Sequence, residues 1–181
     1  GATAGYYGGW VDNGIMRVMD VLLSIPQTLL AIAIIAALGA NLMNLMIAVG
    51  VSAVPTYARI VRGSVLSIRG MEFVEAARSV GSSDLRIILK HIIPNSMAPI
   101  IVQSTLGVAS AILNAAGLSF IGLGIQPPMT SWGALASGAQ QQMLFYPWQL
   151  FFPTLFISLT MLSFQMLGDG LRDALDPRVR D

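Results

Sequence analysis

Two long stretches of this sequence contain no formal charge, and they restrict the fold more than any other feature. No Asp, Glu, Lys or Arg occurs from Val21 to Ala58, and none occurs from His91 to Gly168. A water-exposed surface cannot be built from uncharged stretches of that length. A membrane-spanning helix needs about 20 apolar residues, so each stretch can supply nearly two spans or more. The sequence therefore predicts an all-α, polytopic membrane protein.

Charge is scarce across the whole chain. Only 10% of the 181 residues are charged, and the mean hydropathy is +0.71, whereas an ordinary soluble domain has roughly 25% charged residues. A soluble helical protein with a very apolar core is the alternative, but such a core does not require uncharged stretches this long. The chain has no cysteine, which excludes disulfide bonds and thiolate metal sites.

The apolar runs define four expected spans within a single transmembrane domain of residues 1–181: residues 18–38, 42–61, 97–118 and 148–167. Pro26 should kink the first span, since neighbouring helices can satisfy the freed carbonyl. We expect the uncharged outer loop, 122–147, to dip back against the protein or to lie flat at the interface. The chain begins without Met or a signal peptide pattern, so we expect further spans before it in a longer protein.

The basic residues predict an orientation. They lie at Arg17, between Arg59 and Lys90, and from Arg172 onward, whereas the other two connections contain none. Lys and Arg gather in the cytoplasmic loops of membrane proteins. We therefore expect the N-terminal end of the chain, the segment 62–94 and the C-terminus to be cytoplasmic.

The cytoplasmic segment contains a helix–turn–helix pattern. Residues 72–80 have a helical composition, and Gly81 suits the left-handed position that ends a helix. Ser82 or Ser83 can cap a second helix, whose first turn Asp84 would stabilise through the helix dipole. We expect this second helix to end at Ile93, because a proline follows, and to bear one apolar stripe of Leu85, Ile88, Leu89 and Ile92.

Two helices this short cannot bury a core of their own, because isolated helices under about 12–15 residues are marginal in water. Their apolar side chains therefore need another surface. The residues alone leave three possibilities open: docking to a partner protein, lying on the membrane, or packing beneath the spans. Ala76 and Ala77 are small enough to let such a surface come close to the backbone.

A known family motif resembles this segment. Glu75-Ala76-Ala77, followed by Gly81 and then by Pro94, is similar to the EAA motif in permeases of binding-protein-dependent ABC importers. Several further stretches resemble the second permease of the dipeptide, oligopeptide and nickel branch: 6–10 (YYGGW), 91–95 (HIIPN), 117–120 (GLSF), 122–128 (GLGIQPP) and 168–177 (GDGLRDALDP).

The resemblance implies a type I ABC importer transmembrane domain with a cytoplasmic EAA coupling helix. Glu75, Ala76, Ala77 and Gly81 would form the coupling site for one of two cytoplasmic ATPase subunits, which bind ATP and magnesium. The other implied partners are a second permease subunit, an extracytoplasmic solute-binding protein and the lipid membrane. No cofactor, metal site, catalytic residue or nucleic-acid partner is expected for this chain. The expected solutes are peptides, with nickel or a nickel chelate as the alternative.

One face of the third span carries small and polar residues, namely Gln103, Gly107, Ser110, Asn114 and Gly117. Gln103, Ser110 and Asn114 could line a solute path. Small and polar residues also serve as close contacts between membrane helices, so packing is the competing interpretation.

Two other classes of protein compete with this interpretation. A secondary transporter or channel commonly places ionisable groups inside the membrane, and the long uncharged stretches argue against it. An enzyme would need clustered acid, base or nucleophile groups, but the chain has one His, no Cys and no phosphate-binding P-loop.

Overall fold

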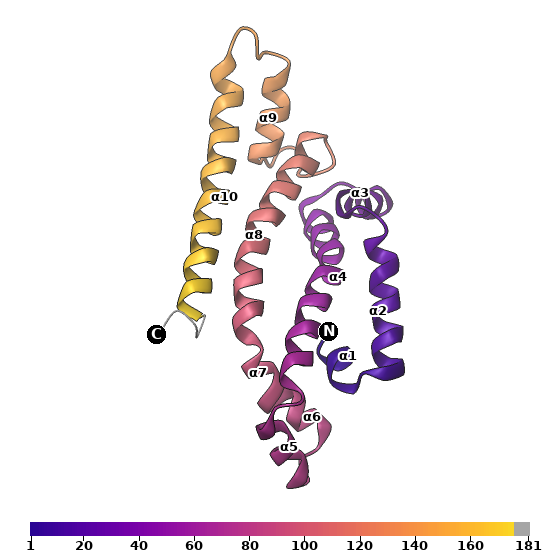
Figure 1. Cartoon of the computed structure of the whole chain (residues 1–181). Helices are drawn as coiled ribbons and strands as arrows, with labels where there is room; N and C mark the ends of the chain where they lie inside the picture. Colours follow the sequence, from indigo (N-terminus) through magenta and orange to yellow (C-terminus); the bar gives the residue numbers. More distant parts are fainter. Residues whose placement is uncertain (176–181) are drawn as a thin grey trace. The chain divides into compact units, whose positions relative to one another are not determined.

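The structure is a computed structural model that describes residues 1–175. Throughout the described residues the regular structure is helical, as the sequence predicts (Figure 1). In chain order the elements are α1 (Ala2–Tyr7), α2 (Gly9–Leu23), α3 (Gln27–Leu38), α4 (Leu42–Ile68), α5 (Glu72–Ser79), α6 (Asp84–Ile87), the π-helix η1 (Ile88–Ile92), α7 (Ile93–Asn95), α8 (Met97–Phe120), α9 (Trp132–Gln140) and α10 (Pro147–Leu175). Residues 176–181, which include Arg178, Arg180 and the end of the 168–177 motif, lie outside the described residues.

Three of these helices are long and apolar enough to cross a membrane: α4, α8 and α10, with 27, 24 and 29 residues. The number rises to four if α2 and α3 together make one span. The helix predicted over 18–38 is interrupted rather than kinked, because Ser24 to Pro26 separate α2 from α3. Pro26 has an extended backbone with ψ of 133° and precedes the first residue of α3. The exact membrane boundaries remain predictions.

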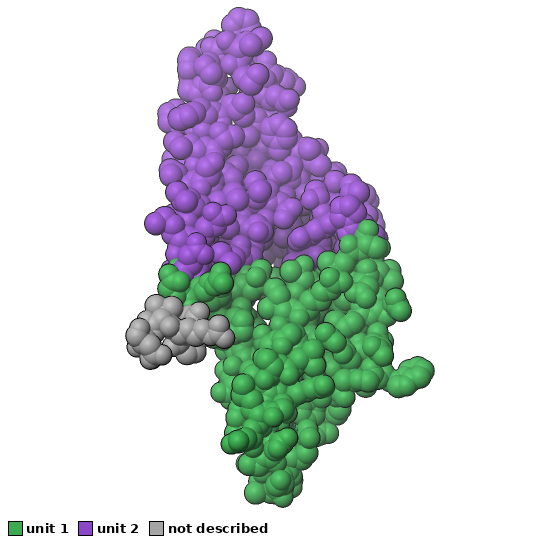
Figure 2. Space-filling view, in the orientation of Figure 1, with its two compact units in different colours: residues 1–24, 54–104, 170–181 green, residues 25–53, 105–169 purple. Residues whose placement is uncertain are grey.

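The described chain divides into two compact units, coloured separately in Figure 2. Unit 1 contains residues 1–24, 54–104 and, from the described tail, 170–175. Unit 2 contains residues 25–53 and 105–169. Each unit has a hydrophobic core of its own. The core of unit 1 joins α1, α4, α5, α6 and η1 through Tyr6, Val65, Ile68, Val74, Ala77, Ile87, Ile88 and Ile92.

The core of unit 2 joins α3, α4 and α8 and contains many small residues. Its buried members are Ala31, Ile35, Leu45, Ala48, Val49 and Leu118. Asn41 caps the start of α4 by accepting a hydrogen bond from the Asn44 backbone N–H at 2.8 Å. Small side chains let membrane helices approach closely, and dispersion contacts then hold them together.

The predicted outer loop 122–147 contains a helix that the sequence pattern did not reveal, α9. Ser131 caps it, since its hydroxyl accepts a hydrogen bond from the Ala134 N–H at 3.2 Å. The buried face of α9 consists of Gly133, Ala136 and Ala139. Residues this small give little hydrophobic signal, which explains why their spacing of three did not suggest a helix.

The expected end of the second short helix at Ile93 is also wrong. Helical backbone continues through η1 into α7, and Pro94 lies inside it. Pro94 occupies one of the first two positions of α7, which are the helical positions that tolerate proline best. The π turn of η1 lies directly before it.

Candidate functional site

The predicted turn at Gly81 is confirmed. Gly81 has φ of +79°, a left-handed conformation that other residues adopt only with strain. The Ser82 N–H donates to the Ala77 carbonyl at 3.1 Å, and the Gly81 N–H donates to the Arg78 carbonyl at 3.0 Å. These two bonds form a Schellman motif, which closes α5 at the expected position. Ser83 then precedes α6 as its N-cap residue, but its side chain makes no capping bond.

The EAA residues of α5 do not share one face. Glu75 and Ala76 are exposed, whereas Ala77 is buried in the core of unit 1 together with Val74. The small side chain of Ala77 lets the chain's own helices pack closely on it, and its role in the coupling site remains a prediction. The surface that α5 presents outward contains Glu75 and Ala76.

The single apolar stripe predicted for the second helix is wrong. Ile88 and Ile92 are buried, but Leu85 is 67% exposed and Leu89 is 55% exposed. Ile87, which lay outside the predicted stripe, is fully buried. Apolar residues occur on nearly every side of this segment, so periodicity alone could not select the buried face. Packing against the other helices of unit 1 selects it, and it leaves Leu85 and Leu89 on the surface beside the polar groups of α6 and η1.

A polar cluster lies over the core of unit 1 and includes a residue that sequence reasoning did not assign to this site. The Tyr6 hydroxyl donates to Asp84 Oδ1 at 2.7 Å and accepts from an Arg78 guanidinium N–H at 3.3 Å. The same guanidinium lies 5.7 Å from the centroid of the Tyr6 ring. Burial, followed by the hydrogen bond to Asp84, raises the pKa of Tyr6 above its ordinary value. Tyr6 therefore stays neutral at physiological pH.

Two ion pairs join α2 to α4 within unit 1. Arg62 contacts Asp12 through two hydrogen bonds of 2.5 Å, and Asp12 is buried. Arg59 contacts Asp20 at 2.6 Å in a more exposed pair. Both arginines therefore lie within the long apolar helix α4, where each is neutralised by a carboxylate of α2.

The three polar residues considered for a solute path lie on α8 but belong to different units. In unit 1, the Gln103 backbone carbonyl accepts a hydrogen bond from the Tyr57 hydroxyl at 3.3 Å. In unit 2, the Asn114 side chain donates to the Ser110 carbonyl at 2.9 Å and accepts from the Thr28 hydroxyl at 3.5 Å. These contacts agree with helix packing for Asn114. Lining of a solute path by Gln103, Ser110 or Asn114 remains a prediction.

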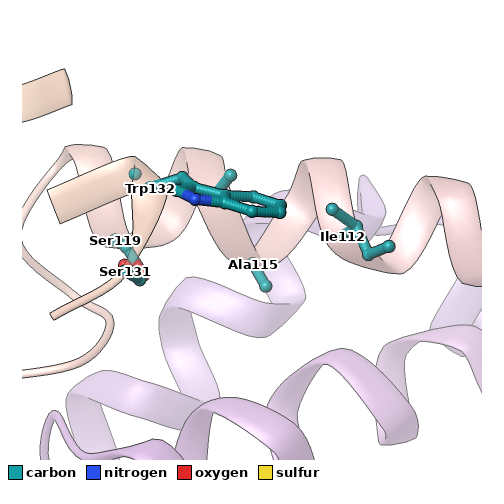
Figure 3. Close-up of a pocket in the computed structure, with 7 residues that line it drawn as sticks. Ile112, Ala115, Ser119, Ser131 and Trp132 are labelled. Carbon is teal, nitrogen blue, oxygen red and sulfur yellow. The ribbon is translucent and has the colours of Figure 1, made fainter. Parts of the chain in front are cut away.

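A small cavity of about 180 Å³ lies between α8 and α9 in unit 2. Figure 3 shows the Trp132 ring lying along α8, with Ile112 toward one end and the serine side chains toward the other. The two serines are Ser119 and Ser131, and Ala115, Ala116 and Gly133 complete the lining. Because Ser131 is already used as the α9 cap, the cavity offers few free polar groups. Among the described residues, no group of three or more His, Cys, Asp or Glu side chains is placed to hold a metal ion.

Comparison with known proteins places the whole chain in one family. Residues 1–181 match the family described as the inner membrane component of binding-protein-dependent transport systems. A dipeptide transport system permease protein from Alkalihalophilus pseudofirmus is 51% identical over 180 residues, which cover 99% of this chain and 59% of that protein. A glutathione transport system permease protein from Pectobacterium atrosepticum is 46% identical over 180 residues, covering 99% of this chain and 60% of the relative.

A second glutathione transport system permease protein, from Escherichia coli O6:K15:H31, is 48% identical over 175 residues. The match covers 97% of this chain and 58% of the relative. The chain thus spans about three fifths of the length of the curated relatives that it matches.

Proposed function

The chain belongs to the family of inner membrane components of binding-protein-dependent transport systems, and on that basis we propose that it is a permease subunit of an ATP-driven peptide importer. Its expected solutes are dipeptides or short peptides such as glutathione, the solutes that name the similar permeases. It would form the pathway together with a second permease subunit.

The observation that carries this proposal is the geometry of α5, Gly81 and α6. The exposed side of α5 offers Glu75 and Ala76, and Val80 beyond its end is 80% exposed. Leu85 and Leu89 add large exposed apolar side chains from the following helix. A partner protein that covers these apolar groups would gain hydrophobic stabilisation. The buried apolar residues of the segment pack against α1 and α4, and the exposed ones leave a second surface that supports docking of a partner.

The inner side of the same segment explains how a partner's movement would reach the membrane. Val74, Ala77, Ile87 and Ile92 are buried against Val65 in one core. Close-packed cores transmit displacement instead of absorbing it. Closure of two ATPase subunits on ATP would therefore displace α5 and η1 together with the adjoining turns of α4 and α8, and the permease pair would alternate between inward- and outward-facing states.

We assign the remaining partners by the same proposal. ATP and magnesium would be bound by two cytoplasmic ATPase subunits, and an extracytoplasmic binding protein would deliver the solute. The segment 62–94 and both ends of the chain would face the cytoplasm, as the basic residues of the short connections favour. The loop that contains α9 would then face the opposite side.

Cysteine labelling tests both docking and orientation, because the sequence contains no native cysteine. We expect Ala76→Cys to crosslink to an ATPase subunit in the complete importer. We expect Met129→Cys, an exposed residue before α9, to react with a membrane-impermeant thiol reagent from outside and to give no such crosslink. Labelling of Ala76→Cys from outside, or an absence of crosslinks at this residue, would contradict the proposal.

Uptake measurements test the solute. The complete importer in sealed vesicles should accumulate a labelled dipeptide or glutathione only when ATP and the binding protein are supplied. Nickel, with and without a chelator, serves as the competing solute. Uptake of nickel but of neither peptide would overturn the peptide assignment and leave the family assignment unchanged.

A further inference from the structure

Tyr6 lies far in sequence from the coupling segment but is buried within it. The residue is 7% exposed, at the end of α1, and shares a core with Val74, Ala77 and Ile87. Its neighbour Tyr7 is 52% exposed and contacts the Tyr6 ring edge-on at 5.1 Å between centroids. The two adjacent tyrosines therefore have different surroundings, and only Tyr6 reaches into the core of unit 1.

The Tyr6 hydroxyl joins the two sides of the Gly81 turn. Arg78 belongs to α5 and Asp84 opens α6, so one oxygen atom bonds to both helices. The backbone of the turn is closed by the two bonds of the Schellman motif. A hydroxyl that donates to a carboxylate and accepts from a guanidinium makes two charge-assisted hydrogen bonds, which are stronger than neutral ones. These bonds restrain how far α5 and α6 can open about Gly81.

A second set of contacts fixes α1 to the cytoplasmic end of α4. The Arg69 guanidinium donates to the Gly5 carbonyl at 3.0 Å. Ala2 and Val61 add apolar contacts to the same core, in which Tyr6 is buried with Val65 and Ile68. Tyr6 thus connects the Gly81 turn to the helix that continues toward the membrane.

We infer that Tyr6 is a positioning residue for coupling: through Arg78 and Asp84 it holds α5 and α6 at a fixed angle and transmits their movement to α4. This inference rests on the proposed function for the coupling itself, but the geometry of the turn can be measured without transport. None of the EAA residues supplies this polar connection, because Glu75 and Ala76 point outward, Ala77 contributes only a buried methyl group and Gly81 has no side chain.

Tyr6→Phe is the sharpest variant, because it keeps the buried ring and removes only the hydroxyl. We expect the complete importer to assemble normally and to bind its ATPases. The uptake of solute per ATP hydrolysed should fall at least about threefold, since two charge-assisted hydrogen bonds are lost. Tyr7→Phe is the matched control, and its uptake of solute per ATP hydrolysed should equal that of the unmodified protein.

Variants of the two partners provide a rescue test. Asp84→Asn keeps an oxygen that can accept from Tyr6, so it should retain more of the uptake-to-hydrolysis ratio than Asp84→Ala. Arg78→Lys should likewise retain a higher uptake-to-hydrolysis ratio than Arg78→Ala. A residue that merely stabilises the fold would lower assembly and hydrolysis together, and it would leave the ratio unchanged.

Spin labels at Ser79→Cys and Arg86→Cys measure the turn directly. The distance distribution between them should broaden in Tyr6→Phe and stay narrow in Tyr7→Phe. An unchanged distribution, together with an unchanged ratio of uptake to hydrolysis, would overturn the inference. If the unmodified importer gave no ATP-dependent uptake, the proposed function would fail instead, and the distance measurement would still decide the role of Tyr6.

Discussion

The two units of this chain differ in the kinds of residue that hold their helices together. Within the described residues, unit 2 contains a single formal charge, Asp169, which is its last residue, and unit 1 contains all the others. Unit 1 also holds the ion pairs, the Tyr6 cluster and the Gly81 turn. Unit 2 instead relies on Ala31, Ala48 and the small face of α9.

The difference shows how each unit fixes its geometry. In unit 1, directional contacts between charged and polar groups act together with a hydrophobic core to set the angles between short helices that could not stay folded alone. In unit 2, the arrangement of the helices depends on how closely their backbones can approach. Lipid is as apolar as the side chains, so hydrophobicity alone does not favour one helix contact over another. Unit 1 should therefore be sensitive to lost polar atoms and to turn geometry, and unit 2 to added volume.

The largest effect is expected at the turn of unit 1. Gly81→Val introduces a β-branched residue at φ of +79°, and the strain should lower transport about tenfold or more. Membrane insertion should be unaffected, because a Cβ at this position meets no atom within 4 Å. ATP-driven uptake and the amount of inserted protein are the measurements.

Two controls separate conformation from volume at this turn. Gly70→Val adds the same side chain to an exposed glycine whose φ is not positive, and it should transport normally. Uptake by Gly81→Asn should lie between that of Gly81→Val and that of the unmodified protein, since Asn tolerates the left-handed region better than valine does. Normal coupling in Gly81→Val would show that the turn is not essential.

The next largest effect belongs to unit 2. A Cβ on Gly133 would lie 2.1 Å from the Ala116 carbonyl oxygen, a backbone atom that cannot move aside cheaply. Gly133→Ala should therefore destabilise the contact between α9 and α8 by about 1–3 kcal/mol, the usual cost of overpacking. Thermal unfolding in detergent, together with thiol exposure of Ala136→Cys, measures the loss.

Gly138→Ala is the matched control on the same helix. A Cβ there meets nothing within 4 Å, so the change should be neutral or stabilising by up to about 1 kcal/mol through helix propensity. Equal destabilisation by both variants would show that α9 does not depend on close approach at Gly133, and the proposed contrast between the units would lose its support.

The turn and the long helices were the parts that the sequence could predict. Gly81 stands out because one residue type fits a left-handed helix end, and α4, α8 and α10 follow from apolar runs that only a membrane accommodates. The start of α5 at Glu72 agrees with the predicted helix, and its end differs by one residue. In each of these cases, neighbouring residues alone determine the conformation.

The parts that could not be predicted depend on distant neighbours. Tyr6 meets Asp84 across 78 positions of sequence, and no local pattern indicates that contact. Leu85 and Ile87 are both apolar, so only packing decides which of them is buried. The burial of Ala77 could not be predicted either, because a small side chain suits an external contact and an internal one equally.

A smaller effect is expected from the buried ion pair of unit 1. Arg62→Met leaves the Asp12 carboxylate without its two hydrogen bonds, which should lower the thermal midpoint because an unpaired buried charge is costly. The loss should be moderate, since the Arg62 side chain is 34% exposed. Arg86→Met, at an exposed position, should leave the midpoint nearly unchanged.

The double variant Asp12→Asn with Arg62→Met shows whether charge is the cause. It removes both charges and should recover part of the midpoint lost in the single variant. Failure to recover any of it would indicate that the Arg62 side chain contributes by packing, in which case unit 1 would resemble unit 2 more closely than the charge distribution suggests.

The smallest effect is a pH dependence confined to unit 1. The folded state raises the pKa of Tyr6, so the neutral phenol is favoured by folding. Its contribution is complete below the unfolded pKa, about 10, and is lost as pH rises through the higher folded value. Stability of α5 should therefore be flat near neutral pH and should decline above about pH 10. Hydrogen exchange of α5 amides measures it.

A decline at alkaline pH does not by itself identify Tyr6 as the cause, so two variants are compared. Tyr6→Phe lacks the titrating hydroxyl, so its α5 amides should be less protected from hydrogen exchange at neutral pH. They should also lose less further protection between about pH 9 and 11, a range centred on the unfolded tyrosine pKa of about 10. Tyr7→Phe should follow the unmodified protein. If the plots of α5 amide protection against pH coincide for Tyr6→Phe and Tyr7→Phe, the turn is held without the Tyr6 hydroxyl. Polar contacts would then determine the geometry of unit 1 less strictly than the close approach of helices determines that of unit 2.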